Sequence, residues 1–126
     1  MVWHPLTALA KVPGLTEVVL IGFYEDSVMA GFIKDSKREF PNITISYLRE
    51  YRPLGTAGGL YHCELSRPFC DIAHTLVRDS ILRPPAPQHI FICNIDVCCS
   101  FPLTEMMELH SKHRGVATIL GVNVSS

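Results

Sequence analysis

The chain has 126 residues, of which 48% are hydrophobic and 18% are charged, and its formal net charge is −1. This composition permits a packed core, in one small domain or in part of a larger one, and argues against disorder. Because the charges are interspersed and no apolar run approaches a membrane span, we expect a protein that binds neither nucleic acid nor membrane.

The first elements alternate between helix and strand. The apolar residues Trp3, Leu6 and Ala10 recur at helical spacing, and a Pro-Gly pair at residues 13–14 ends that segment. Residues 17–23 then form a continuous apolar, β-branched run. Such a run predicts a strand that is buried on both faces.

A second helix and a second strand follow. Ser27 is a candidate N-cap for a helix that runs to about Phe40, and the acidic pair at residues 25–26 complements the dipole at its start. Residues 43–48 read as the next strand. Helical spacing predicts an inward face made of Val28, Met29, Phe32 and Ile33.

The second half of the chain repeats this alternation. Residues 89–94 and 116–122 are predicted strands. Between them lies a predicted helix with Pro102 in its first turn and an apolar face of Leu103, Met106, Met107 and His110. Strands that alternate with helices indicate an α/β fold with a mostly parallel sheet and helices on both faces.

A glycine-rich segment follows the second predicted strand, and we call it the glycine loop. Its residues are Leu54, Gly55, Thr56, Ala57, Gly58 and Gly59. The glycines allow a ligand to approach the backbone closely, and Thr56 can cap a following helix whose free N–H groups favour an anion or a base-edge acceptor. The spacing supports a tight strand-to-helix turn equally well. It matches neither the P-loop nor the dinucleotide fingerprint.

Asp96 lies two positions after the end of the predicted strand at residues 89–94. Ligands of open α/β sheets bind outside the carboxyl ends of the strands, so an aspartate there is well placed to hold Mg²⁺ that bridges substrate phosphates. The alternative is a turn aspartate without a ligand. Asn94, two positions before Asp96, is interpreted as a residue that stabilises the turn by hydrogen bonding to the backbone.

The five cysteines are Cys63, Cys70, Cys93, Cys98 and Cys99. Their number is odd and their spacing fits no zinc pattern, so we interpret them as small apolar residues, with a redox or metal role as the alternative. The segment from Met1 to Pro5 lacks the features of a signal peptide. A cytoplasmic, reduced protein is therefore expected.

Four stretches taken together resemble the sugar nucleotidyltransferases of the mannose-1-phosphate guanylyltransferase type, also called GDP-mannose pyrophosphorylase. They are residues 13–24, 47–50, 53–61 and 94–103. Each stretch alone is a weak signal, but their combination is specific. The run Gly58-Gly59-Leu60-Tyr61 resembles the alpha-subunit type, since catalytic beta-type relatives usually carry proline in place of Gly59.

The resemblance implies a Rossmann-like nucleotidyltransferase domain that acts in GDP-mannose synthesis. This family converts GTP and mannose 1-phosphate to GDP-mannose and pyrophosphate, by positioning and charge neutralisation. By resemblance, the glycine loop contacts the guanine base and Asp96 is the magnesium ligand. The alternative implied by the alpha type is a non-catalytic regulatory subunit, which binds GDP-mannose and controls a catalytic beta subunit in a hetero-oligomer.

The chain departs from the family pattern in two places. The family's first strand and its triphosphate-binding loop with a following lysine are not found in these residues, so we expect residues 1–126 to be a partial domain with negligible catalysis alone. The absent strand would lie between residues 17–23 and 89–94, which leaves unpaired edges and exposed apolar faces. Residues 63–77 have no counterpart in the family pattern and are interpreted as an extra segment.

Overall fold

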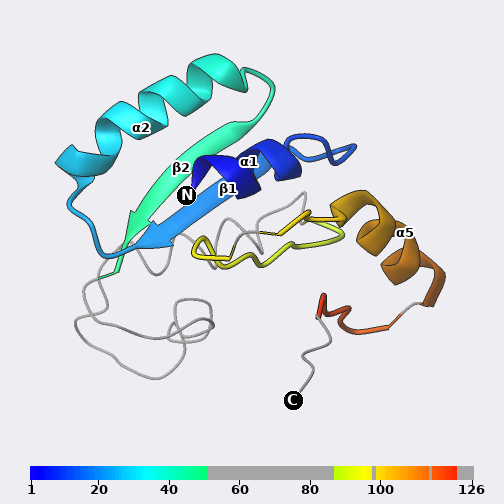
Figure 1. Cartoon of the computed structure of the whole chain (residues 1–126). Helices are drawn as coiled ribbons and strands as arrows, with labels where there is room; N and C mark the ends of the chain where they lie inside the picture. Colours follow the sequence, from blue (N-terminus) through cyan, green and yellow to red (C-terminus); the bar gives the residue numbers. More distant parts are fainter. Residues whose placement is uncertain (51–86, 98, 114, 122–126) are drawn as a thin grey trace, which may run out of the picture. The chain divides into compact units, whose positions relative to one another are not determined.

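The computed structural model describes residues 1–50, 87–97, 99–113 and 115–121 (Figure 1). Its contacts divide the chain into two compact units, Met1–Leu15 with Ile95–Ser126 and, separately, Thr16–Asn94. Each unit is described by itself.

The second unit contains a parallel β-α-β arrangement. Strand β1, Glu17–Gly22, is followed by helix α2, Asp26–Glu39, and by strand β2, Thr44–Arg49 (Figure 1). The two strands pair in parallel from Glu17 opposite Thr44 to Gly22 opposite Arg49. These elements confirm the predicted α/β class and both strands, each to within one residue. The arrangement agrees with part of a Rossmann-like domain.

The core of this sheet lies mainly on β2. Ile45 is fully buried and Leu48 is 8% exposed, whereas the residues of β1 are half-buried except for the exposed Glu17. The prediction that residues 17–23 are buried on both faces is therefore wrong within the described structure. A strand gains that degree of burial only where layers pack on both faces of its sheet.

Helix α2 begins one residue before the predicted cap. Glu25 occupies the N-cap position with extended backbone and without a side-chain capping hydrogen bond, and Asp26 lies in the first turn. Ser27 therefore lies inside the helix, and its predicted capping role is wrong. The acidic pair at residues 25–26 does lie at the positive end of the helix dipole, as predicted.

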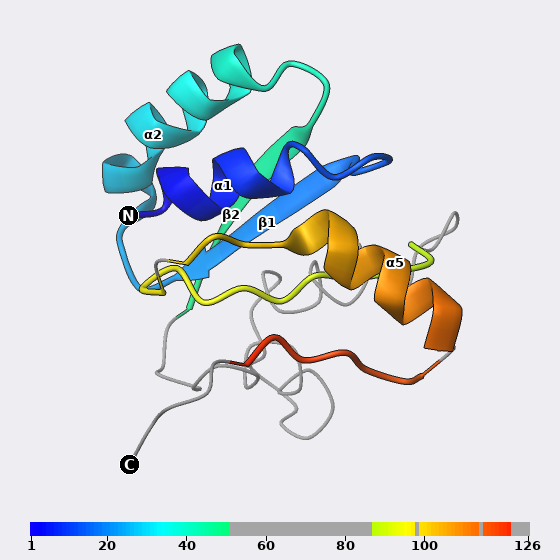
Figure 2. The ribbon, with the colours of Figure 1, turned by 45° about the vertical axis from the view of Figure 1, so that its right-hand side comes forward.

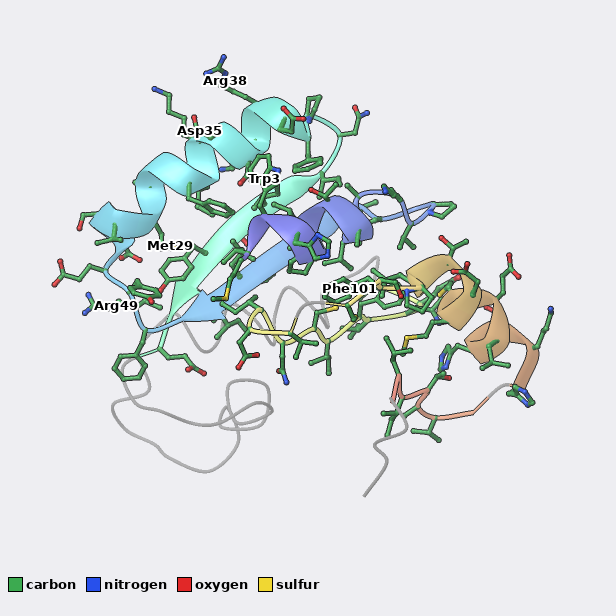
Figure 3. The ribbon with its side chains drawn as sticks, in the orientation of Figure 1. Trp3, Met29, Asp35, Arg38, Arg49 and Phe101 are labelled. Atoms are coloured by element: carbon green, nitrogen blue, oxygen red, sulfur yellow. The ribbon has the colours of Figure 1, made fainter. Side chains whose placement is uncertain are left out.

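The inward face of α2 packs against β2. Met29, Phe32 and Ile33 are half-buried, as their spacing predicts, but Val28 is 63% exposed and does not belong to this face. Asp35 and Arg38 are exposed on the outer side of the helix (Figure 3). The fully buried polar residue of the face is Ser36, one turn beyond Phe32.

The first unit contains two helices. Helix α1, Trp3–Leu9, buries Leu6 and Pro5, and its chain then continues through hydrogen-bonded turns to Gly14. Gly14 has φ of 80°, a conformation that glycine adopts without steric cost. The predicted stop at residues 13–14 thus coincides with a left-handed turn.

Helix α5, Leu103–His113, confirms the predicted helix of the second half. Leu103 is 4% exposed, and basic residues occupy the last turn as the helix dipole favours. Figure 2 shows residues 115–121, in red, turning back after the helix. His110 is half-buried and its Nδ1 lies 2.9 Å from the Thr118 hydroxyl, which agrees with the place of this histidine on the predicted apolar face of the helix.

Two predicted strands are not formed. Residues 89–94 contain no strand, and residues 116–121, the described part of the other run, contain none either. A strand requires a neighbour for its backbone hydrogen bonds, and no described segment pairs with either run. Their apolar side chains are correspondingly exposed: Ile90, Ile92, Val116, Ile119 and Leu120.

Among the described helices, none combines the length and the apolar character that crossing a bilayer requires.

Ser36 provides a test of packing in the second unit. Its hydroxyl is fully buried and has no hydrogen-bond partner among the described residues. A buried, unsatisfied hydroxyl is costly, and alanine has the higher helix propensity. We expect Ser36→Ala to raise the free energy of unfolding by about 1 kcal/mol in urea titration.

The matched control is Ser27→Ala, at an exposed position of the same helix. We expect this variant to change the stability by less than about 0.5 kcal/mol. A clear loss of stability in Ser36→Ala would contradict the prediction, since it would show that the hydroxyl makes a stabilising hydrogen bond.

Candidate functional site

The carboxyl edge of the β1–β2 pair is the first part of the candidate site. The ladder continues past the strands, because the Glu50 N–H donates to the Gly22 carbonyl at 2.7 Å. The Tyr47 hydroxyl donates to the Tyr24 carbonyl at 2.8 Å. These two bonds hold the backbone that follows β1 against β2. The edge is therefore ordered up to Glu50, just before the glycine loop.

Tyr47 also limits the space around Gly22. A Cβ atom built on Gly22 would lie 3.4 Å from the Tyr47 hydroxyl oxygen, so glycine allows the phenol ring to lie close to the first strand. Burial raises the pKa of the Tyr47 hydroxyl above its ordinary value of 10.0, and the Asp26 carboxylate acts in the same direction. The hydroxyl thus stays protonated and able to donate at neutral pH.

The side chains at this edge differ in exposure and in charge. Phe23 is 52% exposed and Tyr24 is 65% exposed. The half-buried Arg49 ends β2 (Figure 3), and the exposed Glu25 and Asp26 lie at the start of α2. The edge thus presents aromatic surface and two carboxylates to solvent.

The glycine loop, residues 54–59, lies outside the described residues, as does the segment 63–77. The predicted contact between this loop and a base therefore stays a prediction. So does its proximity to Asp96.

Asp96 is the second part of the candidate site. It lies in a turn at residues 95–96 and is exposed. Within the described ranges, no three His, Cys, Asp or Glu side chains gather to hold a metal ion. Mg²⁺ commonly binds one or two carboxylates and takes its other oxygens from water and substrate phosphates. Asp96 fits that chemistry, in which the substrate would complete the coordination.

The segment that follows Asp96 is fastened to helix α1. His4 Nε2 lies 3.2 Å from the Cys99 carbonyl oxygen, and the His4 and Phe101 rings meet edge to face with centroids 5.6 Å apart. Phe101, labelled in Figure 3, has φ of 47°. A positive φ is uncommon for a non-glycine residue, and nothing in the dipeptide Phe101-Pro102 predicts it. Sequence reasoning missed this contact.

Two other features are weaker candidates. A shallow depression along α5 is lined by Met107, Glu108, Ser111 and Lys112, but these residues all lie on one face of a single helix. Cys93 and Cys99 are half-buried, in agreement with their interpretation as small apolar residues.

Comparisons with known proteins give a consistent result. The chain is 36% identical over 126 residues to the mannose-1-phosphate guanylyltransferase regulatory subunit alpha of Dictyostelium discoideum, a match that covers 100% of the chain and 27% of that protein. It is 39% identical to the human protein of the same name, with 99% of the chain and 26% of that protein covered. The probable mannose-1-phosphate guanyltransferase of Schizosaccharomyces pombe is 39% identical, with 99% and 27% covered. The chain thus spans little more than a quarter of the length of these relatives. No family model matches.

Tyr47 generates a prediction about pH. Because its pKa is raised in the folded protein, the folded state holds this proton more tightly than the unfolded state does. The associated stability is complete below pH 10.0 and is lost as the pH rises through the folded-state pKa. We expect Tyr47→Phe to lower the free energy of unfolding by about 1 kcal/mol at pH 8 and to flatten its decline above pH 10.

Urea titrations from pH 8 to 11 measure this effect. Tyr24→Phe is the matched control, since it removes an exposed hydroxyl but keeps the carbonyl that accepts from Tyr47. If both variants showed the same alkaline decline as the parent chain, Tyr47 would have no part in it.

Proposed function

The chain belongs by homology to the mannose-1-phosphate guanylyltransferase family, and on this premise we propose that it forms part of the nucleotide-binding domain of an alpha-type subunit in GDP-mannose synthesis. The observation that carries the proposal is the similarity along the whole chain to proteins named regulatory subunit alpha. The parallel β-α-β unit supports it, because nucleotides bind at the carboxyl edge of such sheets.

The proposed ligand is GTP or GDP-mannose. The glycine loop, residues 54–59, contacts the guanine base through its backbone, and the edge ordered by Tyr47 leads the chain into that loop. Asp96 holds Mg²⁺ together with the phosphates. When bound, the ion neutralises phosphate charge and fixes the phosphate oxygens. The exposed position of Asp96 on a turn leaves its carboxylate free to meet such a ligand.

The regulatory role is the one that we favour. In this role the domain senses GDP-mannose and acts on a catalytic beta subunit within a hetero-oligomer, without performing the transfer itself. The names of the Dictyostelium and human relatives support it. We propose a cytoplasmic setting for such a complex, which follows from the sequence-based expectation of a reduced protein.

A catalytic role is the second candidate. Its support is the Schizosaccharomyces pombe relative, which is as similar to the chain as the human protein and is named a probable guanyltransferase. In this role the oxygen of mannose 1-phosphate attacks the α-phosphorus of GTP, and pyrophosphate leaves.

Two measurements on the full-length protein distinguish these roles. Calorimetry with GDP-mannose reports binding, and pyrophosphate release from GTP and mannose 1-phosphate reports transfer. Binding without release supports the regulatory role, whereas release at a normal enzymatic rate supports the catalytic one. Absence of both binding and release would contradict the proposed function.

The proposed metal ligand has its own test. We expect Asp96→Asn to weaken Mg²⁺-dependent nucleotide binding by more than about tenfold, because an amide cannot supply the negative charge. Binding in EDTA should change little. The measurement is calorimetric titration with GTP in Mg²⁺ and in EDTA.

Asp35→Asn serves as the control, since Asp35 is an exposed aspartate on the outer side of α2. It should leave both titrations unchanged. An Asp96→Asn protein that keeps the full magnesium dependence would rule out a ligand role for Asp96.

A further inference from the structure

The contact between His4 and the segment after Asp96 joins residues that are far apart in the chain. His4 belongs to helix α1, and its Nε2 lies 3.2 Å from the Cys99 carbonyl oxygen, 95 residues away in the sequence. A carbonyl can only accept, so the hydrogen lies on Nε2. The same ring meets Phe101 edge to face. One side chain therefore fastens two residues of this segment.

The fastened segment has a strained backbone. Phe101 has φ of 47°, which places Cβ of an L-residue close to its own backbone. Such a conformation persists where the surroundings hold it, and it is often found at functional sites. On its other side the segment is anchored by α5, because the Leu103 N–H donates to the Phe101 carbonyl at 2.7 Å and Leu103 is buried.

Asp96 precedes the two residues that His4 holds. It is exposed, it occupies a turn only three positions before Cys99, and it belongs to the same compact unit as His4 and Phe101. An exposed carboxylate on a loose turn would have to be ordered when a metal ion binds. If the residues next to the turn are already held, less conformational entropy is lost when the metal ion binds, and the ion binds more tightly.

We propose that His4 is a positioning residue, which holds the backbone at Cys99 and Phe101 and thereby limits the movement of the preceding turn, so that Asp96 is oriented for magnesium-dependent nucleotide binding. This role rests on the proposed function. It differs from a general contribution to folding, because it affects the part of binding that depends on the metal.

The test compares variants of the full-length protein by calorimetry with GTP, in Mg²⁺ and in EDTA. We expect His4→Ala to weaken binding by about tenfold in Mg²⁺, the loss typical when a residue supporting a metal ligand is removed, and by less than about twofold in EDTA. His4→Gln keeps a side-chain N–H donor and should restore part of the affinity. His113→Ala, at an exposed histidine of α5, is the matched control.

Hydrogen exchange of the ligand-free protein gives a second readout. In His4→Ala the Leu103 amide, which donates to the Phe101 carbonyl, should exchange faster, while amides in β1 and β2 should keep the parental rate. Faster exchange throughout both units would indicate general destabilisation and would overturn the positioning role.

The outcomes separate this proposal from the one on which it rests. A parent protein that binds no nucleotide overturns the proposed function, and with it the role of His4. A parent that binds with magnesium dependence, together with a His4→Ala variant of equal affinity, overturns only the role of His4. Equal weakening in Mg²⁺ and EDTA overturns it as well.

Discussion

The parallel pairing of β1 with β2 is the constraint on which the second unit depends. Parallel neighbours need a crossover, and α2 supplies it while burying its inner face on β2. Because the strands run in the same direction, the residues that follow each of them meet at one edge. The Tyr47–Tyr24 hydrogen bond then fixes that edge. Any ligand site at the glycine loop therefore starts from an ordered strand end.

In the first unit, the exposed Asp96 lies on a short turn at residues 95–96. Between Asp96 and the start of α5, the described residues belong to no helix or strand. His4 compensates from a distant helix through one hydrogen bond and one ring contact. Phe101 has a strained backbone and is held by the His4 ring and by the hydrogen bond from the Leu103 N–H.

The spacing of apolar residues correctly predicted the elements that depend on contacts within the element or with the next element in the chain. The helices at α2 and α5 follow from apolar spacing, and β1 and β2 are joined by one short crossover. The runs at residues 89–94 and 116–121 have equally strong β propensity, but they form no strand. Propensity describes how a residue fits a pleated sheet, and it does not provide the neighbouring strand that the backbone needs. Ser27 is not the N-cap, because the helix already begins at Asp26 and Glu25, two residues before Ser27, occupies the N-cap position.

The sequence by itself determined the α/β class, the acidic start of α2, the stop at Gly14, and the family resemblance that the comparisons confirm along the whole chain. It also identified Asp96 as a candidate ligand, because residue type and position after an apolar run are local properties. Only the tertiary structure decided that Tyr47 bonds the Tyr24 carbonyl and that His4 contacts Cys99 and Phe101. Both contacts join residues distant in the chain, and no periodicity or spacing encodes which backbone carbonyl a folded side chain will reach.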